Sequence, residues 1–270
     1  MIKEITDPST DMHRDMAIEG FLLGREEWTK EIRQEIKADF VFAQFYGSYF
    51  AKCAKELWEQ IELQGLQTRQ GVPLYDHLKK KGICRYSQFE KHIGKVADRF
   101  WNERFPVYTA WKKRQWKSYC RNGYVDLKTG FRCSGLMNDR ETSNYPIQGA
   151  AFHCLLWCLI EIDKELRLKK YQSKVVFQIH DSVGLVVQPD EYNDVIRLIK
   201  EVTEVRLREQ WDWIIVPLSI EVEVSPMNES WYHQKEVVET TCDVCGAEWV
   251  YPGDDCYECP LCGEKTEIPF

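Results

Sequence analysis

The stretch of sequence that decides the fold is Lys174-Val175-Val176-Phe177-Gln178-Ile179-His180-Asp181-Ser182-Val183-Gly184-Leu185-Val186-Val187. Two apolar, β-branched runs flank a polar tip, which predicts one strand over residues 175–179 and a second over residues 183–187. His180 and Asp181 then lie at the turn of a hairpin. A carboxylate at such a turn can bind a divalent cation, although aspartate is also a common turn residue without that role. The rest of the chain favours the cation.

The composition bounds the size and the chemistry of the protein. A chain of 270 residues is long enough for one large domain, or for one domain with a small module. The net charge of −7 excludes a polycation, so contacts with nucleic acid require local basic patches. No run of about 18 apolar residues is present, which predicts no membrane-spanning segment. Eleven cysteines without a signal-peptide pattern favour thiols or metal over disulfides.

The N-terminal half is predicted to be helical. Asp11 can cap a helix that begins near Met12, and the apolar spacing over residues 28–62 predicts a long helix. Residues 63–86 form a predicted loop-rich insert, and residues 87–121 return to helix.

Two pairs of residues on the helix over 28–62 suggest a binding surface. Arg33 and Lys37 are four apart and share a face, and Phe42 and Tyr46 have the same spacing, with Gly47 next. Cations and aromatic rings in this arrangement can bind a triphosphate and stack on a base. A solvated cationic face backed by core aromatics is the more common alternative for a single helix.

Basic and polar residues recur further along the chain. Trp111-Lys112-Lys113-Arg114 interleaves rings and cations on a helix, which suits a phosphate backbone, although such faces are usually only solvated. Residues 123–132 predict a β-hairpin. Arg140, Asn144 and Gln148 then recur every four residues, and a long apolar helix follows. Residues 190–210 predict an amphipathic helix, and the alternation over 216–224 predicts a strand.

The tail from residue 237 carries two Cys-x-x-Cys-Gly knuckles, which predict a zinc ribbon. The predicted ligands are Cys242, Cys245, Cys259 and Cys262. Cys256 also forms a Cys-x-x-Cys pair with Cys259, so the ligand set has one ambiguity. A tail this short has no core of its own without a metal.

Five of these motifs, in this order, resemble those of family A DNA polymerases, the bacterial DNA polymerase I class and its phage relatives. The motifs are Arg33-x3-Lys37 with Phe42-x3-Tyr46-Gly47, Phe105-Pro106-Val107 with Trp111 before Gly123-Tyr124-Val125, Arg140-x3-Asn144-x3-Gln148-Gly149, Gln178-Ile179-His180-Asp181, and Val216-Pro217-Leu218 through Trp231. They resemble, in turn, the fingers helix, the segment before a family hairpin, the primer–template minor-groove helix, palm motif C and the closing palm strand. The resemblance covers about residues 10–232.

The resemblance implies a role for each group of residues. The nucleotide-binding set is Arg33, Lys37, Phe42 and Tyr46, and the catalytic set is Asp181, His180 and Lys37. The DNA-binding set is Arg140, Asn144 and Gln148, to which the basic helix adds Lys112 and Lys113. Asp181 is the expected ligand of catalytic Mg²⁺, in a two-metal phosphoryl transfer from a dNTP to a primer.

The sequence departs from the family in the fingers helix and in motif C. Nine residues lead from Lys37 to Tyr46, where the family has eight. One inserted residue turns an α-helix by about 100° unless a π-bulge absorbs it. Ser182 follows Asp181 where DNA polymerases commonly have glutamate, and this is more like the phage single-subunit RNA polymerases.

The largest departure concerns motif A, the Asp-x-Ser-x-x-Glu strand that bears the second metal-binding aspartate. It should precede Asp11-Met12-His13, which itself resembles the sequence that follows motif A. Asp7-Pro8-Ser9 matches its first three residues but lacks the glutamate and a preceding strand. We therefore expect the C-terminal part of a split DNA polymerase, with a second chain that supplies motif A, the thumb and possible exonuclease activity.

The expected fold class is α+β: fingers helices and a partial palm with an antiparallel sheet over residues 1–236, and a zinc ribbon over 237–270. The expected partners are primer–template DNA, dNTP and the second chain, in the cytoplasm of a bacterium or a phage-infected cell. A single-subunit RNA polymerase fragment is one alternative. A non-catalytic remnant that binds primer–template is another, against which Asp181, Arg33 and Lys37 argue because DNA binding needs none of them.

Overall fold

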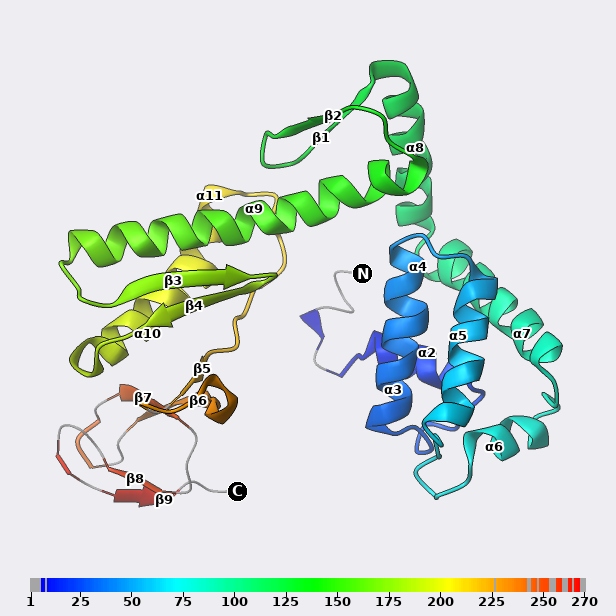
Figure 1. The fold of residues 1–270 in the computed structure, drawn as a ribbon, viewed down its shortest axis with the longest axis horizontal. Coiled ribbons are helices and arrows are strands. Elements are labelled where there is room, and N and C mark those ends of the chain that lie inside the picture. The colour runs from blue at the N-terminus through cyan, green and yellow to red at the C-terminus, as the bar shows by residue number, and fades with distance from the viewer. Residues whose placement is uncertain are drawn as a thin grey trace. The chain divides into compact units, whose positions relative to one another are not determined.

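The computed structural model describes residues 6–7, 9–225, 227–241, 244–246, 248–252, 256–258, 262–263 and 265–267. The chain divides into two compact units, residues 1–150 and residues 151–270, called here the N-terminal and the C-terminal unit. Helices and small antiparallel sheets make up both units (Figure 1), which confirms the α+β class. The functional boundary at residues 236 and 237 stays a prediction.

The N-terminal unit is mainly helical. Its elements are α2 (Met12–Gly20), α3 (Lys30–Ile36), the π-helix η1 (Lys37–Phe42), α4 (Ala43–Phe45), α5 (Phe50–Leu63), α6 (Leu74–Lys80), α7 (Tyr86–Arg99), the π-helix η2 (Phe100–Arg104), α8 (Pro106–Asn122), β1 (Tyr124–Asp126), β2 (Arg132–Ser134) and the start of α9 (Asp139–Leu168).

Local chemistry explains where these helices begin and end. The Asp11 side chain accepts hydrogen bonds from the first turn of α2, so the predicted cap is confirmed. The single long helix predicted over residues 28–62 is wrong. The chain leaves the helix after α4, because Gly47 takes a φ of +86°, and it re-enters at α5. The insert over residues 63–86 contains the short helix α6.

Aromatic rings form the centre of the N-terminal core. Phe40 and Phe100 are buried and meet edge to face, with ring centroids 5.6 Å apart, and Phe21 stacks on Phe89 at 6.1 Å. These contacts come from η1, η2, α7 and the residue after α2. Burying a large aromatic side chain contributes about 3 kcal/mol, so this cluster fixes the helices that carry the predicted binding residues.

The predicted hairpin over residues 123–132 is confirmed, with Val125 opposite Cys133. It packs close to α9, because a Cβ on Gly149 would lie 2.6 Å from Leu127 Cδ2. By length and composition α9 is able to cross a membrane, a test that core helices of water-soluble proteins also pass, and 17% of its apolar window is buried. The absence of a membrane segment stays a prediction.

The C-terminal unit contains the hairpin of β3 (Lys174–Ile179) and β4 (Ser182–Val186). The pair Ile179 and Ser182 closes the ladder, so His180 and Asp181 form the two-residue turn, as predicted. The helical segments after the hairpin, at the predicted 190–210, are α10 (Tyr192–Lys200), the π-helix η4 (Glu201–Arg206) and α11 (Leu207–Gln210). Val175 and Leu185 pack against a core that includes residues of α9 and α10.

The strand predicted over residues 216–224 is wrong for most of its length. Only β5 (Glu223–Val224) is formed, and it pairs with β6 (Lys235–Thr241). Alternation alone does not make a strand, because the backbone also needs a neighbour to pair with. The described tail continues with β7 (Glu248–Pro252), β8 (Cys256–Glu258) and β9 (Lys265–Glu267).

Candidate functional site

Asp11 joins the start of α2 to the middle of α3. Its Oδ2 accepts a hydrogen bond from Arg33 Nε at 2.6 Å, and its Oδ1 accepts one from Arg33 Nη2 at 3.2 Å. The same carboxylate accepts from the backbone N–H groups of His13 and Arg14, both at 3.0 Å. Burial raises the pKa of Asp11, but the hydrogen bonds and the charge of Arg33 outweigh burial and hold that pKa below its ordinary value.

His13 lies beside this ion pair and the predicted aromatic residue. Its ring meets Phe42 edge to face, with centroids 5.7 Å apart. Burial and the positive charges of Arg33 and Lys37 lower the pKa of His13, and Asp11 opposes the shift. The imidazole is therefore neutral at pH 7. Its buried Nδ1 has no hydrogen-bond partner among the described residues, so it can interact with a ligand.

The π-helix η1 brings Phe42 to the same place as Lys37. Lys37 Nζ lies 5.3 Å from the centre of the Phe42 ring, whereas Phe40 turns into the core and is fully buried. A π-turn closes with i→i+5 bonds and takes up one more residue than an α-turn. Such a turn can absorb the one-residue insertion expected between Lys37 and Tyr46, and Phe42 is partly exposed beside the cations.

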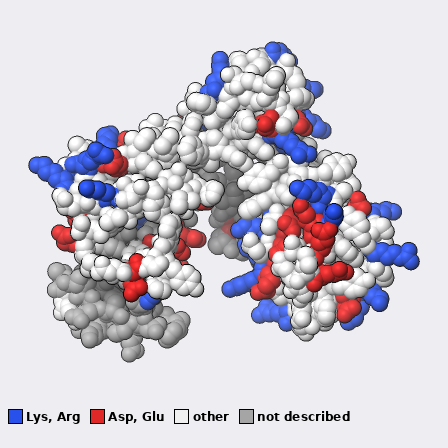
Figure 2. Space-filling model, in the orientation of Figure 1, with Lys and Arg blue, Asp and Glu red and all other residues white. Residues whose placement is uncertain are grey.

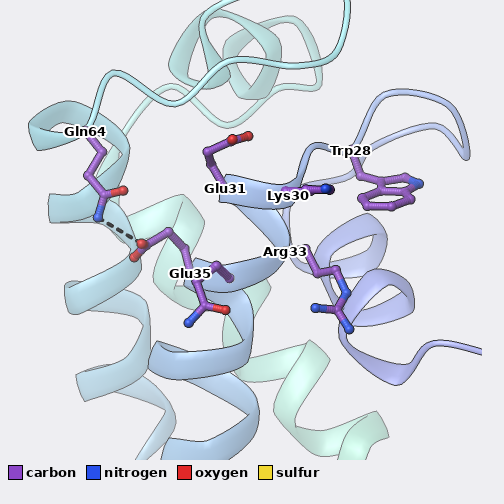
Figure 3. Close-up of a pocket in the computed structure, with 7 residues that line it drawn as sticks. Trp28, Lys30, Glu31, Arg33, Glu35 and Gln64 are labelled. Atoms are coloured by element: carbon purple, nitrogen blue, oxygen red, sulfur yellow. Dashed lines mark hydrogen bonds between the residues drawn. The ribbon is translucent and has the colours of Figure 1, made fainter. Parts of the chain in front are cut away.

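Arg33 also borders an open hollow of about 600 Å³ on the outer side of α3 (Figure 3). Trp28 lies near Arg33 in Figure 3, and Gln64 Nε2 donates a hydrogen bond to Glu35 Oε1 at 2.8 Å across the hollow from them. Lys30 and Arg33 add positive charge to the lining of the hollow, and the glutamates of α3, Glu31 and Glu35, add negative charge. The mixed lining suits water better than a compact apolar ligand.

The end of α4 packs on the start of α9. Asn144 Nδ2 donates to the carbonyl oxygen of Tyr46 at 3.4 Å. A Cβ on Gly47 would lie only 2.9 Å from Arg140 Cγ, so glycine lets the arginine stem cross the backbone. Tyr46, Arg140 and Gln148 remain exposed. Three predicted residues from two motifs, Tyr46, Arg140 and Asn144, are therefore neighbours.

The two lysines predicted to bind DNA differ in their surroundings. Lys112 is half-buried, with Nζ 3.4 Å from the centre of the Trp101 ring, and burial lowers the pKa of this lysine. Lys113 is exposed. Lysine and arginine side chains project around the part of the surface that α8 forms (Figure 2). Trp101, in η2, donates from Nε1 to Gln44 Oε1 at 2.8 Å, so the ring that Lys112 contacts is joined to α4.

Asp181 lies at the tip of the β3–β4 hairpin with an exposed side chain. His180 takes a φ of +52°, in the left-handed region, and its carbonyl oxygen accepts from Gln178 Nε2. Behind the turn, the Phe177 ring lies flat over Gly184 and stacks on Trp231, with centroids 5.0 Å apart. The turn therefore presents one carboxylate on a braced hairpin.

Asp181 is not part of a cluster of metal-ligating side chains among the described residues. No group of three or more His, Cys, Asp or Glu side chains that suits a metal occurs among the described residues. The Asp7 carboxylate accepts hydrogen bonds from Ser9 N and Ser9 Oγ, which lower its pKa and form a local turn.

The predicted zinc ligands can be followed only in part. Cys242 and Cys259 lie outside the described residues, as does the side chain of Cys256. Cys245 and Cys262 are exposed, and each precedes a glycine in the left-handed conformation, Gly246 with φ of +71° and Gly263 with φ of +75°. The same backbone geometry thus recurs at both knuckles.

Residues 1–233 match the family model of DNA polymerase family A. The chain belongs to this family. Similar curated proteins include the DNA polymerase I of Mycobacterium bovis, 21% identical over 198 residues that cover 73% of this chain, and that of Chloroflexus aurantiacus, 28% identical over 116 residues that cover 39%. That of Lactococcus lactis subsp. cremoris is 31% identical over 97 residues, or 36% of the chain.

This family A chain spans only part of those relatives. The matched segments cover 20%, 12% and 10% of the M. bovis, C. aurantiacus and L. lactis proteins. Among solved structures, the POL domain of Pol1 from M. smegmatis, in complex with DNA primer-template and dNTP, aligns with 75% of this chain and 32% of its own. The identity is 20% and the TM-score is 0.48.

Sequence reasoning missed three residues that the structure places at these sites. Asp11 was identified only as a helix cap, although it also binds Arg33. His13 was noted only as part of a family segment, and Trp231 only as the end of a strand. Their partners lie far away in the sequence, and no periodic pattern signals such contacts.

Proposed function

We propose that this chain forms the fingers and part of the palm of a template-directed DNA polymerase, which extends a primer with dNTPs. The observation that carries the proposal is the convergence of Arg33, Lys37, His13 and Phe42 in a member of family A. Two cations, a neutral imidazole and a partly exposed ring are the groups that a nucleoside triphosphate needs. Tyr46 lies on the next helical turn, where it can contact the sugar or base.

Within this proposal, Arg33 and Lys37 hold the triphosphate and Phe42 stacks on the incoming base. The fork of Arg33 matches two phosphate oxygens, while Lys37 adds a point charge. Arg140, Asn144 and Gln148 contact the primer–template, and Lys112 and Lys113 add positive charge from α8. The contacts of Asn144 with Tyr46 and of Arg140 with Gly47 then connect the nucleotide-binding residues to the DNA-binding residues.

The donor chemistry of Asp181 fits Mg²⁺, which prefers carboxylate oxygens, and His180 holds the turn that carries it. When bound, two such ions activate the primer 3′-oxygen and neutralise the charge that builds on the transferring phosphate. One carboxylate does not balance two divalent cations. We therefore infer that a second carboxylate comes from a strand outside these 270 residues, carried by a partner chain.

The exposed surface of the β3–β4 hairpin is consistent with the proposal that a further strand packs against it. Val176, Ile179 and Val186 are each about half exposed, at 52%, 48% and 58%. The described sheet has two strands, so one edge of each strand lacks a ladder partner within it. An added strand would satisfy those backbone groups and cover apolar side chains.

We also propose that Cys242, Cys245, Cys259 and Cys262 hold one structural zinc ion. The left-handed glycines after Cys245 and Cys262 support two equivalent knuckles. Elemental analysis should find about one zinc per chain. Cys256→Ser should leave the metal in place, and loss of zinc in that variant would assign Cys256 as a ligand instead.

Primer extension tests the main proposal, with the purified chain first alone and then with its partner. We expect little extension by the chain alone and Mg²⁺-dependent extension with the partner, as for a cytoplasmic bacterial or phage replication enzyme. Arg33→Ala and Lys37→Ala should reduce dNTP incorporation far more than affinity for primer–template. Robust extension by the chain alone that Asp7→Asn abolishes would make Asp7 the second metal ligand.

A further inference from the structure

We propose that Asp11 is a positioning residue for nucleotide binding, because it aims the Arg33 guanidinium at the triphosphate and fixes His13 beside it. The inference rests on the proposed role of Arg33 as a triphosphate ligand. Asp11 comes from the turn before α2 and Arg33 from α3, 22 residues later. The carboxylate therefore couples two helices that both carry binding groups.

The geometry of the ion pair leaves the binding edge of Arg33 available. Arginine has five N–H donors in a planar fork. Asp11 accepts from Nε and from Nη2, which lie along one side of the fork. The remaining donors, on Nη1 and Nη2, form the end of the fork, and Nη1 has no hydrogen-bond partner in the part of the chain that the structure describes. That end is the one that binds two phosphate oxygens at once.

The same carboxylate sets the position of His13. It accepts from the N–H groups of His13 and Arg14 and so begins helix α2. His13 is the second residue of that helix, and its ring direction follows from where the helix starts. Because Arg33 is held by both oxygens of the same carboxylate, the Arg33 and His13 side chains keep a fixed separation. An arginine without this contact has many rotamers to lose when a ligand binds.

A carboxylate beside a phosphate site also has an unfavourable effect, because it repels the bound anion. Removing Asp11 therefore has two opposite consequences. It abolishes the repulsion, which favours binding, and it releases Arg33, which weakens binding. Only the first consequence remains once Arg33 itself is gone. Removing the Asp11 carboxylate should thus weaken triphosphate binding when residue 33 is arginine, and should not weaken it when Arg33 has been replaced.

The test measures the affinity of the full 270-residue chain for magnesium tripolyphosphate by isothermal titration calorimetry. The variants are Asp11→Asn, Arg33→Gln and the double variant. Asparagine caps a helix as well as aspartate does, so α2 keeps its start. Asp11→Asn should weaken binding about threefold to tenfold in the wild-type background. In the Arg33→Gln background the same change should leave affinity equal or increase it.

Thr29→Ala is the matched control, because Thr29 caps α3 through Ile32 N without touching Asp11. It should lower the thermal midpoint and leave tripolyphosphate affinity nearly unchanged. If Asp11→Asn bound tripolyphosphate more tightly in both backgrounds, the Asp11 carboxylate would only repel the anion, and this result would overturn the inference. Equal weakening in both backgrounds would mean that Asp11 acts independently of Arg33 and would overturn the inference as well. If Arg33→Gln alone changes nothing, the proposed triphosphate site itself is wrong.

Discussion

The helices around η1 and the β3–β4 hairpin differ in how completely they bury their apolar side chains. Phe40 and Ile36 are fully buried, and the rings around Phe40 come from elements of the same unit. In the hairpin, Val176 and Val186 are more than half exposed, although Val175 packs against the core of its own unit. The core rings of the first region are covered by its own sequence, whereas the hairpin is covered on one face.

The difference separates two kinds of site. The predicted nucleotide-binding side chains rest on a complete core, so this part of the chain can hold its geometry alone. A two-stranded hairpin is marginal in water unless further strands or a packed helix support it. The carboxylate of Asp181 therefore stands on a support that a further strand would complete.

The largest expected effect removes the carboxylate at the hairpin tip. Asp181→Asn should lower Mg²⁺-dependent primer extension by about a thousandfold or more, because a neutral amide does not hold two divalent cations. The assay uses the chain together with the proposed partner chain. Asp190→Asn, another exposed aspartate of the C-terminal unit, is the control and should retain activity. Unchanged extension by Asp181→Asn would end the metal assignment.

The second effect compares the two regions directly by stability. Phe40→Ala should lower the free energy of unfolding by about 3–5 kcal/mol, because it leaves a cavity between Phe100 and its neighbours. Val176→Ala should cost less than about 1 kcal/mol, since the side chain is half exposed. Urea denaturation measures both. If Val176→Ala lowers the free energy of unfolding more once the proposed partner is bound, the difference between the two regions comes from a missing neighbour. Equal losses for Phe40→Ala and Val176→Ala in the isolated chain would contradict that difference.

The third effect concerns two glycines with nearly the same backbone. Gly47 and Gly82 have φ of +86° and +88°, so alanine at either should cost about 1–2 kcal/mol of stability. Of the two, only Gly47 lies against Arg140, whereas a Cβ on Gly82 meets nothing within 4 Å in the part of the chain that the structure describes. Gly47→Ala should therefore weaken primer–template binding in gel shifts, and Gly82→Ala should not. Equal affinity of both variants for primer–template would mean that Arg140 does not contact the DNA.

The smallest effect is the titration of His13, whose pKa lies below 6.5 because of burial and of Arg33 and Lys37. The unfolded chain then binds the proton more readily, so the contribution of His13 to stability falls as pH falls through about 6.5. His13→Gln should remove this pH dependence from thermal unfolding. Histidine NMR should give a titration midpoint below 6.5 for His13, and a midpoint above 6.5 would contradict the burial of the ring beside Arg33 and Lys37.

Local patterns predicted the elements that depend on neighbours in the chain. The run 174–187 encodes both strands and their turn, because alternating apolar residues and a two-residue tip fix the register. Asp11 predicted the start of α2 for the same reason, since a cap acts within one turn. The motif order also indicated the family, which the match over residues 1–233 confirms.

Patterns failed where a distant partner decides the outcome. The long helix over residues 28–62 ends early, because Gly47 must let Arg140 cross its backbone. The strand over 216–224 shrinks to β5, the only part of it that pairs, with β6, among the described residues. A backbone that has no ladder partner gains nothing from its alternating side chains.

By itself the sequence determined the α+β class and the hairpin that carries Asp181, which follow from short-range rules of spacing, capping and turn formation. The candidate binding side chains came from the resemblance to a family and stay a prediction. Only the tertiary structure decided which of them meet. Phe40 is buried in the core and the π-turn leaves Phe42 beside Lys37 and His13. The Asp11–Arg33 ion pair joins residues 22 apart in the sequence. Such contacts depend on how helices pack, and packing is a property of the whole chain.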